Sequence, residues 1–162
     1  MKKIYLAGPD VFETDAIAQG QKFKALCHQY GFEGHFPLDN TIKAADTPYE
    51  TAKAIQEANI ALIHNCDIII ANLNPFRGLE PDSGTVFEVG YAMALGKEVY
   101  AYAEDLSPMI TRIQEAHNLP ENATLCREGK VIEDFGLSHN LMMIDKVIGT
   151  HLEAVLKKIT TH

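Results

Sequence analysis

The chain has 162 residues, 46% of them hydrophobic, which suits one compact domain with a substantial core. Its 22 acidic and 14 basic residues give a formal net charge of −8, and the basic residues form no cluster. A chain with this charge balance has no basic surface that would bind a nucleic-acid backbone, so we expect no nucleic-acid partner. From the length we expect a single domain over residues 1–162.

The N-terminal segment, residues 1–12, puts two lysines before a short apolar run. The run is too brief for the apolar region of a signal peptide and is typical of a buried strand. No other stretch approaches the ~20 apolar residues that a membrane span needs. We therefore expect a soluble, cytoplasmic protein with no membrane partner.

The cysteines and histidines form no disulfide or metal-binding pattern. Cys27, Cys66 and Cys126 are odd in number and widely separated, and no C-x-x-C pair occurs. The seven histidines form no H-x-x-x-H or H-E-x-x-H arrangement. We expect buried or half-buried thiols, no metal and no cofactor.

In the first 65 residues, expected strands alternate with expected helices. Residues 3–7 are a compact apolar run ended by Gly-Pro-Asp at 8–10, which predicts a buried strand and a turn. A helix over 16–30 is closed by a glycine, and 34–38 indicates a weak second strand. Apolar residues at helical spacing then predict a helix over 48–65.

The second part of the chain continues the alternation. Residues 67–72 are a nearly continuous β-branched run, typical of a central strand in a parallel sheet covered on both faces. Prolines, glycines and charges make 74–84 a loop. The elements expected after it are a helix over 85–95, a strand over 98–102 and helices over 108–117 and 145–160.

This order predicts an α/β fold: a doubly wound, flavodoxin-like parallel sheet of about five strands with helices on both faces. Ligands of such sheets bind at the carboxyl ends of the strands, where the chain reverses direction. Two loops qualify as that site, residues 8–12 and 73–84.

Two carboxylates six positions apart, Asp82 and Glu88, lie where the second of these loops enters a helix. In a regular helix a six-residue separation turns two side chains about 240° apart, so they share a pocket only if Asp82 precedes the helix. Ser83 and Gly84 favour such a helix start.

Structural roles account for the same two residues. Thr85-x-x-Glu88 matches a capping box, and Asp82 or Ser83 would serve as a plain N-cap. Against a capping role, Glu88 stands in an otherwise apolar, small-residue helix, where a carboxylate is usually paired or functional because burying a lone charge is costly. The spacing leaves both interpretations open.

Other candidates carry weaker signals. Tyr5 lies in the first strand, where a core tyrosine with a satisfied hydroxyl is the more common case. Residues 8–10 lack the spacing of a dinucleotide-binding loop, and the chain has no P-loop motif. Arg77 could bind an anion, although a surface ion pair with Glu80 or Asp82 is the simpler interpretation.

Four segments together resemble the nucleoside 2-deoxyribosyltransferase family: residues 3–12, 67–72, 75–91 and 135–143. The stretch from Asp82 to Glu88 is the most specific. The resemblance implies a ping-pong transfer in which Glu88 attacks C1 of deoxyribose and expels the base, leaving a covalent deoxyribosyl-enzyme. A second base then attacks from the side that the first one left, so configuration is retained, as in retaining glycoside hydrolysis.

The resemblance also implies roles for other residues. Tyr5 would hold and tune Glu88, and Asp82 would hydrogen-bond the sugar hydroxyls. Asn140 and Met142 match a family segment that reaches into a neighbouring subunit's site. The implied enzyme is a homo-oligomer, a dimer or larger, with shared active sites, and its ligands are deoxynucleosides and free nucleobases.

One departure concerns the proton of the leaving base. Some bacterial members carry an aspartate in the helix before the central strand, proposed to protonate the base, and Asn59 stands there in this chain. An amide cannot deliver that proton, so Asp10 or a water would serve instead. The predicted substrate-binding positions on this chain's own loops and helices are Asp10, Phe12, Asp39, Asn59 and Gly84.

Two other functions remain open. A 2-deoxynucleoside 5-monophosphate glycosidase has the same fold but hands the sugar to water, and it needs a phosphate pocket of amides, hydroxyls or cations. Pro9, which lacks an amide proton, and the acidic Asp10 disfavour such a pocket in the first loop. The other alternative is a non-catalytic nucleotide-binding module, in which Glu88 is only a cap.

Overall fold

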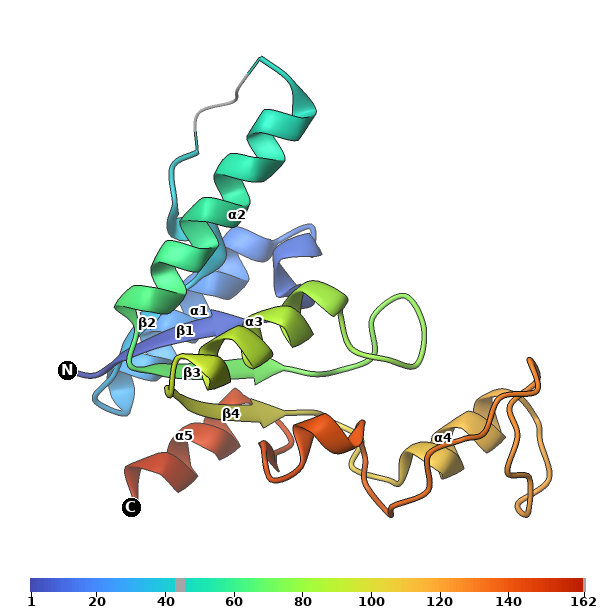
Figure 1. Cartoon of the computed structure of the whole chain (residues 1–162). Helices are drawn as coiled ribbons and strands as arrows, with labels where there is room; N and C mark the ends of the chain where they lie inside the picture. The colour runs from blue at the N-terminus through green and yellow to red at the C-terminus, as the bar shows by residue number, and fades with distance from the viewer. Residues whose placement is uncertain (43–45, 162) are drawn as a thin grey trace.

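The computed structural model describes residues 1–42 and 46–161, and its centre is one all-parallel sheet (Figure 1). Its strand order is β2-β1-β3-β4-β5, the order of flavodoxin-like folds. The strands are β1 (Lys3–Ala7), β2 (Glu33–His35), β3 (Ile68–Asn72), β4 (Glu98–Tyr102) and β5 (Val147–Gly149). The sequence-based prediction of a doubly wound parallel sheet is confirmed.

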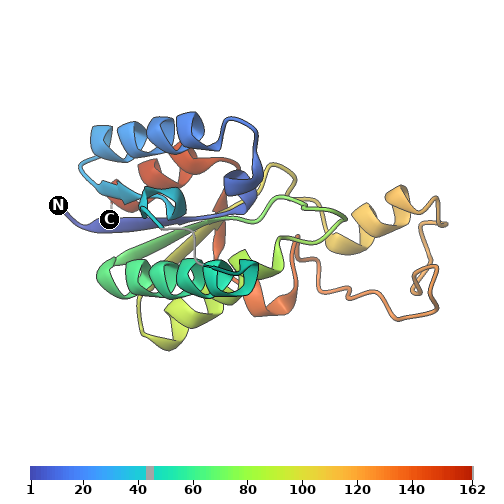
Figure 2. The ribbon, with the colours of Figure 1, turned by 90° about the horizontal axis from the view of Figure 1, so that it is seen from above.

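Two pairs of helices cover the two faces of the sheet (Figure 2). α1 (Ala16–Gln29) and α5 (Leu152–Thr160) pack on one face, and α2 (Pro48–Asn65) and α3 (Ser83–Ala94) pack on the other. Successive strand residues point to opposite faces, so each strand contributes to two separate hydrophobic clusters. The helix predicted over 48–65 has the same bounds in the structure.

β3 is buried along its whole length, as its sequence predicts for a central strand. Ile68 and Ile70 enter the cluster under α1 and α5, and Ile69 enters the cluster under α2 and α3. Full burial of each such side chain stabilises the fold by about 1.5–3 kcal/mol. The strand ends in a polar residue, Asn72, which is only 7% exposed.

Two predicted elements have bounds that differ from the structure by more than two residues. The strand predicted over 34–38 lies at Glu33–His35, because Pro37 starts a 3-10 turn, η2 (Pro37–Asp39), whose Asp39 accepts a hydrogen bond from the Phe36 amide. The predicted helix over 145–160 was also wrong: its first part forms β5. Gly149 ends that strand against Val155 of α5, where a Cβ would lie 3.1 Å from the Val155 side chain.

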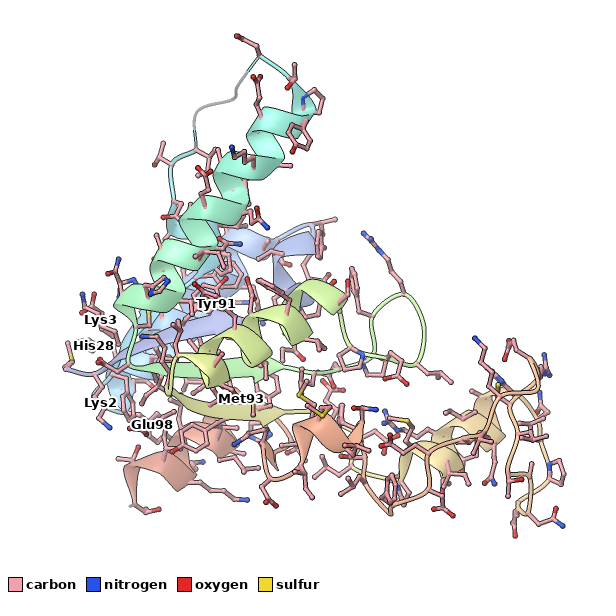
Figure 3. The ribbon with its side chains drawn as sticks, viewed as in Figure 1. Lys2, Lys3, His28, Tyr91, Met93 and Glu98 are labelled. Carbon is pink, nitrogen blue, oxygen red and sulfur yellow. The ribbon has the colours of Figure 1, made fainter. Side chains whose placement is uncertain are left out.

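Between β4 and β5 the chain leaves the sheet and forms a projection that we call the arm, residues 104–146 (Figures 1 and 2). The arm contains α4 (Met109–Ala116) and a 3-10 turn, η3 (Leu141–Met143). In both views α4 lies beyond the edge where the strands end. The opposite edge of the sheet holds the ion pair of Lys2 with Glu98, seen at the other end of the molecule in Figure 3.

Candidate functional site

Tyr5 and Glu88 form a hydrogen-bonded pair beneath α3. The fully buried Tyr5 hydroxyl donates to Glu88 Oε1 over 2.6 Å, joining the central part of the sheet to the helix. Burial raises the pKa of Glu88 to about 7; the Tyr5 hydrogen bond opposes this shift and the nearby Asp82 carboxylate adds to it. The carboxyl group is thus set to change protonation near neutral pH, as a catalytic acid, base or nucleophile requires.

The start of α3 shows which residue caps the helix. Asp82 is the N-cap, and its Oδ2 accepts from the Thr85 amide at 2.9 Å and from the Thr85 hydroxyl at 3.0 Å. Gly84 keeps this turn open, because a Cβ there would lie 3.0 Å from Asp82 Oδ2. The capping-box interpretation of Glu88 is therefore wrong, and the N-cap interpretation of Asp82 is right. Since both bonds use one oxygen, capping leaves Asp82 Oδ1 available to a ligand.

A cavity of about 360 Å³ lies between α2 and α3, within the range of small-molecule sites. Its lining includes Ile55, Asn59 and Ile60 from α2 and Gly84, Phe87 and Glu88 from α3. Within the described residues, the buried amide oxygen of Asn59 has no hydrogen-bond partner. A buried acceptor of this kind costs about 1–3 kcal/mol until a donor reaches it, which is consistent with a ligand contact.

The loop after β1 is tied to the end of β3. Asn72 Nδ2 donates to Asp10 Oδ2 over 2.9 Å, at the junction where the chain reverses direction between β1 and β3. Gly8 permits this approach, because a Cβ there would lie 2.5 Å from Asp10 Oδ2 and 2.8 Å from Asn72 Cβ. Sequence reasoning missed Asn72, whose only signal was a polar residue ending an apolar strand.

The two loops predicted to hold the site meet through their aromatic residues. Phe12 of η1 (Pro9–Phe12) stacks on Phe76 with ring centroids 5.1 Å apart, and the Arg77 guanidinium lies 5.2 and 4.5 Å from the two rings. The predicted ion pair of Arg77 with Glu80 or Asp82 does not occur among the described residues. The guanidinium packs instead on the apolar rings, a cation–π contact.

Tyr5 and Asp82 lie beside Glu88, but five other predicted site residues lie outside the lining of the cavity: Asp10, Phe12, Asp39, Asn140 and Met142. Asp39 binds the Phe36 amide at 2.9 Å and Lys24 Nζ at 2.5 Å, beside the edge strand β2. Asn140 and Met142 lie on the arm, where Asn140 caps η3, and Met142 is 67% exposed. Within one copy of the chain, the structure therefore brings together Tyr5, Asp82, Gly84, Asn59 and Glu88.

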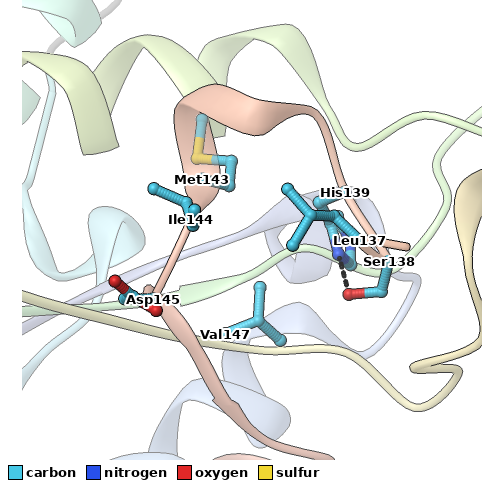
Figure 4. Close-up of a pocket in the computed structure, with 7 residues that line it drawn as sticks. All are labelled: Leu137, Ser138, His139, Met143, Ile144, Asp145 and Val147. Atoms are coloured by element: carbon cyan, nitrogen blue, oxygen red, sulfur yellow. Dashed lines mark hydrogen bonds between the residues drawn. The ribbon is translucent and has the colours of Figure 1, made fainter. Parts of the chain in front are cut away.

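His139 attaches the arm to the sheet (Figure 4). Its Nε2 lies 2.9 Å from the carbonyl oxygen of Leu73, to which it must donate, so its Nδ1 accepts from the Ser138 hydroxyl at 3.0 Å. Burial lowers the pKa of His139, which keeps the ring neutral. The adjacent cavity of about 80 Å³ is too small for a nucleoside, and sequence reasoning missed this attachment.

Residues 1–42 and 46–161 contain neither a metal-binding cluster nor a membrane-spanning helix. No three His, Cys, Asp or Glu side chains gather there closely enough to hold a metal ion. No helix in that part of the chain has the length and apolar content for a membrane span. Burial raises the pKa of the Cys27 thiol to about 12 and that of Cys66 to about 11, as expected for unreactive core thiols.

Comparison with known proteins gives a consistent picture. The sequence profile described as nucleoside 2-deoxyribosyltransferase matches residues 4–142. The solved structure of a 2-deoxyribosyltransferase from Leishmania mexicana superposes with a TM-score of 0.80 and 35% identity, covering 100% of this chain and 99% of that one.

More distant relatives share the fold. A 2-deoxyribosyltransferase from Bacillus psychrosaccharolyticus gives a TM-score of 0.60 at 18% identity, covering 99% of this chain and 91% of that one. A conserved protein from Enterococcus faecalis gives 0.63 at 21%, with 99% and 98% covered. An uncharacterised protein of Schizosaccharomyces pombe is 34% identical over 105 residues, 63% of this chain and 50% of that protein, so this chain spans about half of that relative. The chain belongs to the nucleoside 2-deoxyribosyltransferase family.

Proposed function

We propose that the protein moves the 2-deoxyribosyl group between nucleobases through a covalent bond to Glu88. The observation that carries the proposal is the 2.6 Å hydrogen bond from the buried Tyr5 to Glu88, at the wall of a cavity large enough for a nucleoside. A carboxylate held in this way is oriented before substrate arrives, which is a large part of the catalytic task.

The reaction proceeds in two displacements. Tyr5 holds Glu88 Oε1, so Oε2 bonds to C1 of the sugar while the C1–N bond breaks and its electron pair leaves with the base. The nitrogen of a second base then attacks C1 from the vacated side, and the glutamate leaves as a carboxylate. Two inversions retain the configuration. Asp82 Oδ1 accepts hydrogen bonds from the sugar hydroxyls, while Oδ2 keeps the helix cap.

The proposal includes a homo-oligomer in which the arm of one subunit completes the site of another. The exposed apolar side chains of the arm support this: Leu141 is 43%, Met142 67% and Ile144 56% exposed, close together in sequence. Clustered exposed apolar residues are typical of interaction surfaces. The partner is a second copy of this chain, and the setting we propose is nucleotide salvage in the cytoplasm.

The strongest alternative is a glycosidase that releases the base from a 2-deoxynucleoside 5-monophosphate. The observation that favours it is Arg77, a cation at the mouth of the two site loops with no ion-pair partner among the described residues. A guanidinium is well suited to bind a phosphate.

The test is a base-exchange assay. The purified protein is incubated with deoxyinosine, with and without adenine, beside Glu88→Ala and a control variant, Glu57→Ala, that removes an exposed carboxylate of α2. We expect deoxyadenosine from the wild type and the control, and a loss of about a thousandfold or more in Glu88→Ala. Circular dichroism checks that each variant is folded.

Other results contradict the proposal in identifiable ways. Hypoxanthine released at one rate with or without adenine indicates a hydrolase, and deoxyinosine monophosphate as the better substrate identifies the glycosidase. An unchanged rate in folded Glu88→Ala eliminates the covalent mechanism. No reaction with any deoxynucleoside or its monophosphate indicates a non-catalytic module.

A further inference from the structure

Asn72 makes two hydrogen bonds whose directions can be assigned. Its Oδ1 lies 3.1 Å from the backbone nitrogen of Asn74, and its Nδ2 lies 2.9 Å from Asp10 Oδ2. A backbone N–H can only donate, so the atom facing Asn74 is the amide oxygen. The atom facing Asp10 is therefore the NH₂ group, and Asp10 Oδ2 accepts from it.

The polarity of this bond determines what Asp10 can do. The NH₂ group of Asn72 donates to Asp10 Oδ2, so this oxygen is an acceptor in the structure. The bond holds one oxygen in place, leaving Oδ1 for a ligand. The donor is a buried side chain at the end of β3, since Asn72 is only 7% exposed.

The pair lies where a flavodoxin-like fold places its ligand. Asp10 follows β1 and Asn72 ends β3, the two neighbouring strands between which the direction of winding changes. Phe12 and Phe76, from the loops that follow the same two strands, stack on each other with ring centroids 5.1 Å apart. A planar ligand that stacks on aromatic rings directs the polar groups on its edge toward the side chains that surround the rings.

We propose that Asn72 is a positioning residue that orients the Asp10 carboxylate, and that Asp10 Oδ1 accepts a hydrogen bond from a donor on the edge of the nucleobase. For adenine the donor is the 6-amino group. This inference rests on the proposed deoxyribosyl transfer and adds a base-selecting contact to it. In this role Asp10 accepts a hydrogen bond from the base, and a water molecule protonates the leaving base.

The first test compares adenine with unsubstituted purine, which lacks the 6-amino group, as acceptor bases. The quantity measured is the ratio of kcat/KM for the two bases in the wild type, in Asp10→Asn and in Asp15→Asn. Asp15 is an exposed carboxylate whose side chain makes no capping bond at α1, so its variant is the matched control. Comparing ratios between proteins cancels the different intrinsic reactivities of the two bases.

We expect Asp10→Asn to lower the adenine-to-purine ratio by about tenfold or more, mainly through KM for adenine, because a hydrogen bond to a charged acceptor is lost. Asp15→Asn should keep the wild-type ratio. An unchanged ratio in folded, active Asp10→Asn overturns the inference while leaving the transfer function intact. Absence of transfer by the wild type overturns both.

The second test is Asn72→Asp, which has nearly the same shape and keeps the acceptor for Asn74. It replaces the group that donates to Asp10 Oδ2 with a carboxyl oxygen, so the hydrogen bond that orients Asp10 is lost and the two carboxyl groups repel each other.

For Asn72→Asp we expect the adenine-to-purine ratio of kcat/KM to fall about tenfold, mainly through KM for adenine, because Asp10 is no longer held in place. A purely structural role for Asn72 would lower the rate for both bases alike and leave the ratio unchanged. A wild-type ratio in folded, active Asn72→Asp overturns the inference.

Discussion

At the scale of single residues, burial and one hydrogen bond act on Glu88 in opposite directions. Burial favours the protonated carboxyl, and the Tyr5 hydroxyl favours the carboxylate, with burial the larger effect. A nucleophile must be ionised, so the hydrogen bond recovers part of the reactivity that burial removes.

We predict that Tyr5→Phe raises the pKa of Glu88 above about 7, because it removes the group that stabilises the carboxylate. The rising limb of the kcat/KM profile should then shift to higher pH and kcat should fall. Tyr100→Phe is the matched control, since its hydroxyl bonds Glu98 at 3.2 Å. Wild-type profiles from Tyr5→Phe would contradict the role assigned to this hydroxyl.

The raised pKa of Glu88 also has an effect on stability. Between pH 4.5, the ordinary value, and about 7, the folded protein keeps a proton that the unfolded chain releases. Stability due to this group therefore falls as pH rises through that window, by about 3 kcal/mol in all. We predict that Glu88→Gln is more stable than the wild type at about pH 8 and matches it near pH 4.5, as measured by urea denaturation.

At the scale of elements, Asp82 caps the N-terminus of α3 and, under the proposed function, also binds the sugar. We predict that Asp82→Ala loses about 1 kcal/mol of stability, because the cap is removed, and also loses activity. Asp82→Asn should keep the stability, since asparagine is an equally good N-cap, while its activity still falls. Thermal unfolding and kcat/KM of the two variants separate the roles, and full activity in Asp82→Asn would exclude the carboxylate from catalysis.

Most elements could be predicted because their patterns extend over many residues. The apolar run of β3 and the helical spacing of α2 each identify an element and its place in the core. β5 has only three residues, and their neighbours in sequence have helical propensity, so the strand depends on pairing with β4. Local pattern carries no information on such tertiary pairing.

The same distinction applies to the site. Asp82 and Glu88 could be predicted because they are close in sequence and Glu88 breaks an apolar pattern. The bond between Tyr5 and Glu88 spans 83 positions, and the bond between Asn72 and Asp10 spans 62. These contacts form only when the chain folds, so the sequence identifies candidate residues but not which residues they contact. His139 was missed for the same reason, because its partner is a backbone carbonyl.

At the scale of the whole molecule, the proposed function makes the arm decide whether one chain has a complete active site. Asn140 and Met142 lie outside the cavity lined by Glu88 in the same chain, whereas Tyr5 and Asp82 lie beside Glu88. Under the proposed function, a shared site requires both a nucleophile and an arm from different subunits.

We predict that two inactive variants complement each other. Glu88→Ala lacks the nucleophile but has an intact arm, and a variant with both Asn140→Ala and Met142→Ala has the reverse defect. Mixed and reassembled, they should regain up to about a quarter of wild-type activity in a dimer, because only some sites receive both intact parts. Light scattering gives the subunit count, and a monomeric wild type or a mixture without activity would rule out the shared site.

The position of the arm within the chain bears on how such an enzyme can diverge. The arm is an insertion in the connection between two adjacent strands, β4 and β5, and doubling the length of a connection costs only about 0.6 kcal/mol. Mutations there can lengthen, shorten or rewrite the segment while β1, β3 and α3 keep the Tyr5 and Glu88 geometry. Under the proposed function, subunit assembly is thus free to evolve in one stretch of the gene while the bond-breaking chemistry is inherited unchanged in another.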